Sequence, residues 1–136
     1  MVRVQIKRID IATDSAVSLM ALCVKNAKRE LLEYLENPSC AVYMYDDMAL
    51  VAVLETPDTI DILDIAVKPD SQNRGIGKAV LNAVINIYNR PVMLEVRASN
   101  APARALYKSC GFKEISLRKN YYTAPVEDAV IYRREI

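Results

Sequence analysis

The stretch Gln72-Asn73-Arg74-Gly75-Ile76-Gly77-Lys78 decides the fold prediction, because it joins an apolar strand-like segment, 59–67, to an amphipathic helix that begins at Ile76. A turn from strand to helix leaves several backbone N–H groups without helical partners. Those donors, the positive end of the helix dipole and two glycines that let the main chain approach an anion can bind a phosphate. We therefore expect a phosphate-bearing cofactor held mainly by backbone.

Three other interpretations of this loop exist. A dinucleotide-binding turn requires G-x-G-x-x-G with an acidic residue about 20 positions later, and that spacing is missing. A Walker loop requires G-x-x-x-x-G-K-[ST], which is also missing. A plain strand-to-helix turn without a ligand stays open on the residues alone.

Length and composition fit one domain over residues 1–136, of which 52% are hydrophobic. A net charge of +1 predicts no nucleic-acid partner and no attraction to an anionic membrane. No apolar run approaches the roughly 18 residues of a membrane span, and the N-terminus has no signal-peptide layout. Cys23, Cys40 and Cys110 lack metal-ligand spacing and indicate reduced thiols in a cytoplasmic protein.

The chain contains no histidine, which narrows its chemistry. Ser-His-Asp and Cys-His nucleophilic sites are excluded. Three scattered cysteines are a poor substitute as zinc ligands, so we expect no metal. Any general acid or base must therefore be a carboxylate, a tyrosine, a lysine or water.

The predicted element order is β-α-α-β-β-β-α-β-α-β-β, an α+β (mixed α/β) fold with a mostly antiparallel central sheet. The strand–helix–strand unit over 59–97 requires one parallel strand pair in that sheet. Gly111 fits the left-handed residue after a helix, and Phe112 can fold back onto that helix. The predicted segments are strand 2–6, helices 14–23 and 27–36, strands 41–45, 48–54 and 59–67, helix 76–88, strand 92–96, helix 101–109, and strands 113–117 and 129–133.

Several motifs resemble one known family. The loop Gln72-x-x-Gly75-x-Gly77 resembles the acyl-CoA loop of the GNAT acetyltransferase superfamily, and the element order agrees with that fold. The stretch 94–100, Leu-Glu-Val-Arg-Ala-Ser-Asn, is more specific. Together with 105–112, Asn-Tyr-Tyr at 120–122 and Glu-Asp-Ala at 127–129, it resembles the bacterial RimI type, which acetylates the N-terminal alanine of a ribosomal protein.

The resemblance implies acetyl-CoA as a cosubstrate. Three strand residues would pair through their main chain with the pantetheine arm, the loop would wrap the pyrophosphate, and Asn100 would contact the cofactor. From the residues alone, the strand residues are core, Arg74 and Lys78 are solvated cations, and Asn100 is a helix N-cap. The expected cofactor-binding residues are Ile65, Ala66, Val67, Asn73, Arg74, Gly75, Ile76, Gly77, Lys78 and Asn100.

Glu95 and Tyr107 are the candidate base and acid of an acyl transfer to an amine. Glu95 interrupts an apolar strand and can take a proton directly or through a water; alternatively it lies on a solvated face or pairs with Arg97. Tyr107 is protonated at neutral pH and can donate to a departing thiolate; alternatively it packs on Phe112. Their spacing of twelve lets both face one cleft, and the resemblance assigns them these roles.

Tyr121 and Tyr122 either line the acceptor groove or pack on a sheet edge. By resemblance, the preferred acceptor is a protein N-terminus, such as that of a ribosomal protein. The alternatives are the same chemistry on a small amine, a non-catalytic acyl-CoA-binding module, and a nucleotide-binding regulatory domain. The expected oligomeric state is a monomer or a homodimer.

Overall fold

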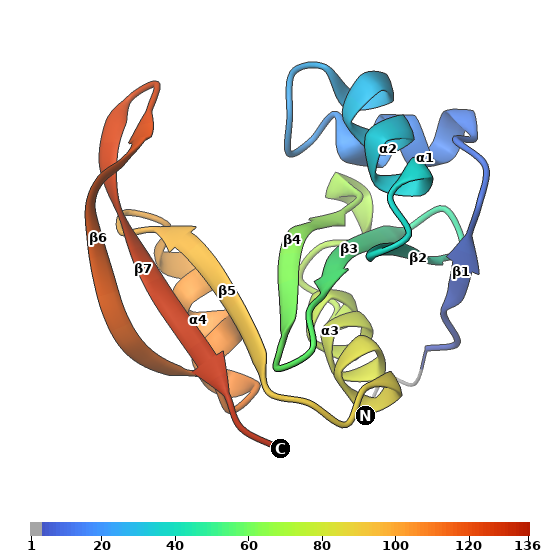
Figure 1. Ribbon diagram of the computed structural model, residues 1–136. Coiled ribbons are helices and arrows are strands. Elements are labelled where there is room, and N and C mark those ends of the chain that lie inside the picture. Colours follow the sequence, from blue (N-terminus) through green and yellow to red (C-terminus); the bar gives the residue numbers. More distant parts are fainter. Residues whose placement is uncertain (1–3) are drawn as a thin grey trace.

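The computed structural model describes residues 4–136, which form one seven-stranded sheet with helices on both faces (Figure 1). The strand order is β1-β2-β3-β4-β5-β7-β6, and β4 with β5 is the parallel pair. The elements are β1 (Lys7–Ile9), α1 (Asp14–Met20), α2 (Ala27–Glu36), β2 (Cys40–Tyr45), β3 (Ala49–Glu55), β4 (Ile60–Val67), the 3₁₀ turn η1 (Pro69–Ser71), α3 (Ile76–Ile87), β5 (Val92–Arg97), α4 (Ala101–Ser109), β6 (Lys113–Thr123) and β7 (Val126–Arg134).

The predicted order of helices and strands is confirmed, with η1 as an addition. The bounds of α2 and α4 match the prediction, whereas α1 ends three residues earlier than predicted. The last two strands are longer than predicted, at eleven and nine residues. All but one residue of β6 is exposed, so no alternation of apolar and polar residues marks its length.

The predicted first strand is wrong in position. Residues 4–6 lie outside any strand, whereas β1 begins at Lys7, opposite Met44 of β2; the start of the predicted strand 2–6 lies outside the described residues. β2 ends one residue after this pair, and the chain then turns at Asp46, which has a φ of 44°. Residues before β1 therefore approach a turn instead of a strand with which they could pair.

Two apolar clusters, one on each face of the sheet, hold the helices in place. α3 and α4 pack through one cluster, which includes Leu81 and receives Val51 from β3. α1 and α2 pack through the other, which includes Leu31 and receives Leu50 from β3. The central strands are thus covered on both sides, which explains their nearly continuous apolar sequence. None of the described helices has the length and apolar character required to cross a bilayer.

β4 and β5 run side by side only where they begin. Three residue pairs join them, from Ile60 with Val92 to Ile62 with Leu94. The register of β4 against β3 then shifts, and β4 and β5 diverge (Figure 1). Within the described chain, the last five residues of β4 have no strand partner on the β5 side. The sheet therefore contains a free strand edge in its interior.

Gly111 ends α4 in the predicted left-handed conformation, with a φ of 88°. A Cβ at this position would lie 3.4 Å from Nε of Arg134. We expect Gly111→Ala to lower the free energy of unfolding by about 1–2 kcal/mol, measured by urea denaturation, because alanine is strained in this region. Gly77→Ala is the control, since its added Cβ would have contacts of 3.6 Å or longer. Equal stability of the two variants would contradict the strain argument.

Candidate active site

A groove of about 410 Å³ lies beside the free edge of β4, between the loop before α3 and the helix α4. Tyr107 lines it from α4. The structure also brings together here eight of the ten predicted cofactor-binding residues, namely Ile65, Val67, Asn73, Gly75, Ile76, Gly77, Lys78 and Asn100.

The other two predicted residues do not place their side chains in this groove. Ala66 alternates to the opposite face of β4 and packs in the cluster beneath α1 and α2. Arg74 lies between two left-handed residues, Asn73 and Gly75, and lines a separate hollow that includes three aspartates. Arg74 thus contributes its backbone to the loop, while its side chain lines the separate hollow.

The loop presents backbone donors that have no partners within residues 4–136. From Asn73 to Lys78 no N–H is hydrogen-bonded in this part of the chain; the first bond into α3 runs from Ala79 N–H to the Gly75 carbonyl, at 3.0 Å. Left-handed residues that alternate with right-handed ones are typical of anion-binding nests. This loop therefore suits a phosphate group.

Gln72 also lines the groove, although it is not among the predicted cofactor-binding residues. Its side-chain amide donates to the Val67 carbonyl at 3.0 Å and ties the loop to the end of β4. The available signal was its place at the start of the Gln72-x-x-Gly75-x-Gly77 motif.

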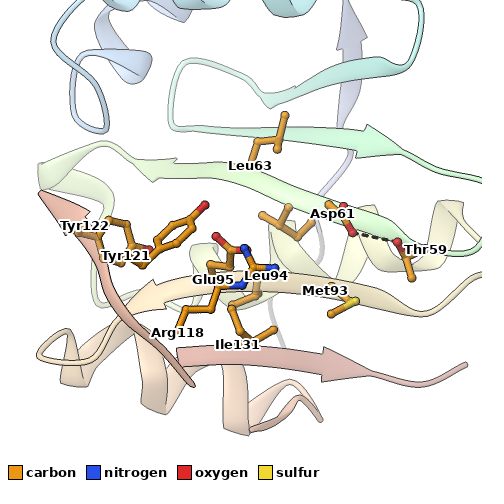
Figure 2. Close-up of a pocket in the computed structure, with 11 residues that line it drawn as sticks. Thr59, Asp61, Leu63, Met93, Leu94, Glu95, Arg118, Tyr121, Tyr122 and Ile131 are labelled. Atoms are coloured by element: carbon orange, nitrogen blue, oxygen red, sulfur yellow. Dashed lines mark hydrogen bonds and ion pairs between the residues drawn. The ribbon is translucent and has the colours of Figure 1, made fainter. Parts of the chain in front are cut away.

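A second cavity, of about 530 Å³, contains the candidate base (Figure 2). Glu95 lines it together with the predicted acceptor residues Tyr121 and Tyr122. The neighbours of Glu95 in β5 are buried on the α4 side, so the strand period turns Glu95 to the opposite face. Its Oε1 lies 3.6 Å from Nη1 of Arg118, and its side chain is 32% exposed.

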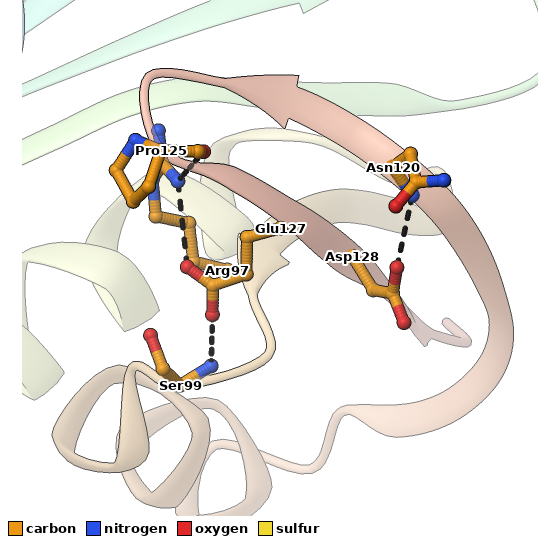
Figure 3. A network of polar contacts seen from close by, with 6 residues as sticks. All are labelled: Arg97, Ser99, Asn120, Pro125, Glu127 and Asp128. Carbon is orange, nitrogen blue, oxygen red and sulfur yellow. Dashed lines mark hydrogen bonds and ion pairs between the residues drawn. The ribbon is translucent and has the colours of Figure 1, made fainter.

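A polar network holds the β6–β7 hairpin against the start of α4 (Figure 3). Glu127 accepts hydrogen bonds from Ser99 N–H at 2.6 Å and from Arg97 Nη1 at 3.3 Å, and these bonds lower the pKa of Glu127. The Arg97 guanidinium also lies 4.4 Å from the ring centre of Tyr122. Arg97 thus positions Tyr122 and does not pair with Glu95.

Tyr107 lies on the α4 side of β5 and lines the groove, whereas Glu95 lines the second cavity. The difference follows from alternation in β5, because α4 packs against the face that Glu95 leaves. Burial raises the pKa of Tyr107 to about 12, and the nearby Cys23 and Tyr122 add to the shift. Tyr107 is therefore a protonated phenol at neutral pH, next to the free edge of β4.

Two further polar groups near the free edge were missed by sequence reasoning. The Tyr34 hydroxyl donates to the Asp64 carboxylate at 2.6 Å, and burial raises the pKa of Asp64. The Cys23 thiol lies 3.5 Å from the Ile65 carbonyl oxygen, and burial raises the pKa of Cys23 to about 11. A carboxylate inside an apolar strand was the available signal for Asp64; nothing in the sequence indicated the position of Cys23.

A model of the acetyltransferase (GNAT) family matches residues 18–112. The chain belongs to the GNAT family. The match covers the groove, the Glu95 strand and α4, and it ends just before β6. It therefore includes both candidate catalytic residues but not Tyr121 and Tyr122.

The proteins that are similar to this chain carry different names. The [ribosomal protein bS18]-alanine N-acetyltransferase of Salmonella typhimurium is 45% identical over 93 residues, and this match spans 63% of either chain. The crystal structure of the ribosomal-protein-S18-alanine N-acetyltransferase of Escherichia coli has a TM-score of 0.80 at 28% identity, covering 97% of this chain and 94% of that one. An IAA acetyltransferase from Bacillus cereus has a TM-score of 0.79 at 25% identity, covering 98% and 99%.

Proposed function

We propose that this GNAT protein is an acetyl-CoA-dependent N-acetyltransferase whose preferred acceptor is the N-terminal α-amine of a protein. The observation that carries this proposal is the divergence of β4 and β5. It leaves a free strand edge between a groove with unpartnered amides and a cavity that contains a carboxylate. A thioester held along this edge would lie between a proton acceptor and a proton donor.

Two features of the groove support acetyl-CoA as its ligand. The amides of the loop from Asn73 to Lys78 would bind the diphosphate, and the edge of β4 would pair with the amide-containing pantetheine arm. The carbonyls of Ile65 and Val67 each already accept one contact, from Cys23 and Gln72. A carbonyl oxygen has two lone pairs, so each retains room for a second donor.

The proposed reaction transfers acetyl from sulfur to nitrogen in one step. Glu95 accepts a proton from the acceptor ammonium, directly or through water, and the neutral amine attacks the thioester carbon. Backbone N–H at the end of β4, near Val67, would stabilise the carbonyl oxygen as it gains charge. The C–N bond forms, the C–S bond breaks, and Tyr107 donates its proton to the leaving thiolate. The nitrogen loses its second proton to solvent, and solvent restores Glu95 and Tyr107.

An N-terminal amine is the acceptor that is easiest to deprotonate. Its pKa near ~7.8 leaves about a seventh of it neutral at pH 7, whereas neutralising a lysine side chain with a pKa near ~10.4 costs roughly 4.6 kcal/mol. The printed names of the Salmonella and Escherichia coli relatives, both alanine N-acetyltransferases of a ribosomal protein, support the same acceptor class. We extend that class to this chain, with a ribosomal protein as the first partner to examine.

Acetylation of a small amine is the second candidate function. Its support is the similar fold of the Bacillus cereus IAA acetyltransferase, whose printed name specifies no protein acceptor. The cavity around Glu95 is large enough for such a molecule.

Turnover of acetyl-CoA on two acceptor panels tests these functions. One panel contains peptides with different first residues, and the other contains polyamines, aminoglycosides and amino acids; release of free thiol is the readout. We expect activity on peptides, and activity on metabolites alone would favour the second candidate. Binding of acetyl-CoA without turnover on either panel would identify a non-catalytic acyl-CoA-binding module.

The two cations of the loop are expected to differ in their effect on the cosubstrate. Lys78 lines the groove, so Lys78→Ala should raise the KM for acetyl-CoA about fivefold, and the effect should shrink at high salt. Arg74 lines the other hollow, so Arg74→Ala should leave this KM nearly unchanged. Steady-state kinetics at two ionic strengths measure both variants. Equal effects of the two substitutions would contradict the assignment of Lys78 alone to the groove.

A further inference from the structure

Arg118 is the one positively charged side chain among the described residues that line the Glu95 cavity. It reaches Glu95 on β5 from β6, across β7, because its register partner on β7 is the small, fully buried Ala129. In Figure 2 its side chain lies against Glu95.

The contact between Arg118 and Glu95 leaves the guanidinium able to bind another group. Its nitrogen–oxygen distance of 3.6 Å is longer than a hydrogen bond, so the five N–H donors of the guanidinium remain available. The side chain is 60% exposed, and its Cζ lies 5.6 Å from the ring centre of Tyr121. The Tyr121 ring and the Glu95 carboxylate thus hold the Arg118 guanidinium at the cavity and leave its N–H donors available for a ligand.

We propose that Glu95 and Arg118 together recognise the first residue of a polypeptide acceptor. Glu95 binds its α-ammonium group, and Arg118 donates hydrogen bonds to the carbonyl oxygen of the same residue. This inference rests on the function proposed above and names the residue that selects the acceptor class.

The geometry of an amino-acid residue matches this pair. Three bonds separate its nitrogen from its carbonyl oxygen, so the two atoms lie within about 4 Å of each other. The facing Oε1 and Nη1 atoms of Glu95 and Arg118 are 3.6 Å apart, with the negative group available for the ammonium and the positive group for the carbonyl. Lysine side chains, polyamines and alkylamines have no carbonyl at that distance. Arg118 therefore favours an N-terminal amine over these other amines.

Two acceptors that differ at the carbonyl test this assignment. One is a short peptide that begins with alanine. The other is isopropylamine, which has the branched carbon of alanine with a methyl group in place of the carbonyl. Comparing variant with wild type separately for each acceptor cancels the intrinsic difference between the two amines. Where isopropylamine is not acetylated, its competitive inhibition of peptide turnover is measured instead.

We expect Arg118→Ala to lower kcat/KM for the peptide about 10- to 100-fold, mainly through the acceptor KM, because a hydrogen bond from a charged group is lost. The KM for acetyl-CoA and the response to isopropylamine should not change. Arg118→Lys, which keeps one charged donor group, should recover part of the loss. Lys119→Ala is the matched control, since it removes an exposed charge from the same strand outside the cavity.

The possible failures can be told apart. Equal losses with both acceptors, or no loss with the peptide, would overturn the role of Arg118 while leaving the acetyltransferase function intact. A wild-type protein that acetylates no amine at all would overturn the proposed function and this inference with it. Thermal unfolding of each variant checks that the fold is retained, as the exposure of Arg118 leads us to expect.

Discussion

Replacement of Glu95 by glutamine is expected to lower kcat about 10²- to 10⁴-fold, the range typical for loss of a general base. Glutamine keeps the size of the side chain but cannot accept the proton of the attacking amine. The fold should persist, because the ion pair with Arg118 is largely exposed and such pairs contribute about 0–1 kcal/mol. Steady-state turnover gives kcat, and calorimetric titration with acetyl-CoA shows that binding is retained.

Glu114→Gln is the matched control for Glu95→Gln. Glu114 also pairs with an arginine, Arg104, at 3.2 Å, but it does not line the Glu95 cavity. Its substitution should leave kcat unchanged. If Glu95→Gln retains the wild-type kcat, another carboxylate must act as the base. The next candidates are Asp61 of the same cavity and Asp64 near the free edge.

Replacement of Tyr107 by phenylalanine is expected to lower kcat about 10²-fold or more, because the leaving thiolate loses its proton donor. The ring would still pack against Phe112 and Tyr132, whose ring centres lie 5.9 and 6.0 Å away. Stability at pH 7 and the Kd for acetyl-CoA should therefore stay close to wild type. Pre-steady-state thiol release separates the chemical step from product release, and an unchanged chemical rate would exclude Tyr107 as the acid.

The same substitution should change how stability depends on alkaline pH. Because folding raises the pKa of Tyr107 from 10.0 to about 12, its contribution to stability is complete below pH 10 and is lost as the pH rises toward 12. Wild type should lose about 1.4 kcal/mol more than Tyr107→Phe between pH 9 and pH 11. Urea denaturation at these two pH values measures the difference, and parallel losses would contradict a raised pKa.

The fold could be predicted from local patterns because most elements carry clear signals. The helix that starts at Ile76 has regular apolar spacing, and Gly111 marks the end of α4. The strands that carried no such signal were predicted less well. β1 is defined by where β2 ends, and β6 is exposed along almost its whole length, so neither could be placed from its own residues.

Many residues of the candidate site could be predicted from the sequence, but their arrangement could not. The motif indicated the loop, Glu95 and Tyr107, yet the placement of the two side chains on opposite faces of β5 depends on which face of this strand α4 packs against. Arg74 shows the same limit, because two neighbouring left-handed residues direct its side chain elsewhere. Arg118 was missed because it meets Glu95 only through the register of three strands.

The interior position of the β4 edge also lowers the risk of aggregation. An unpaired strand at the outer margin of a sheet invites a strand from another molecule, which is a common route to aggregation. Here the unpaired stretch is bordered by β3, closed at its base by β5 and flanked by helices on both faces. A strand from another molecule would meet β3, β5 or the helices before it could pair with this stretch. The unpaired stretch of β4 is thus kept away from the outer margins of the sheet, which are formed by β1 and β6.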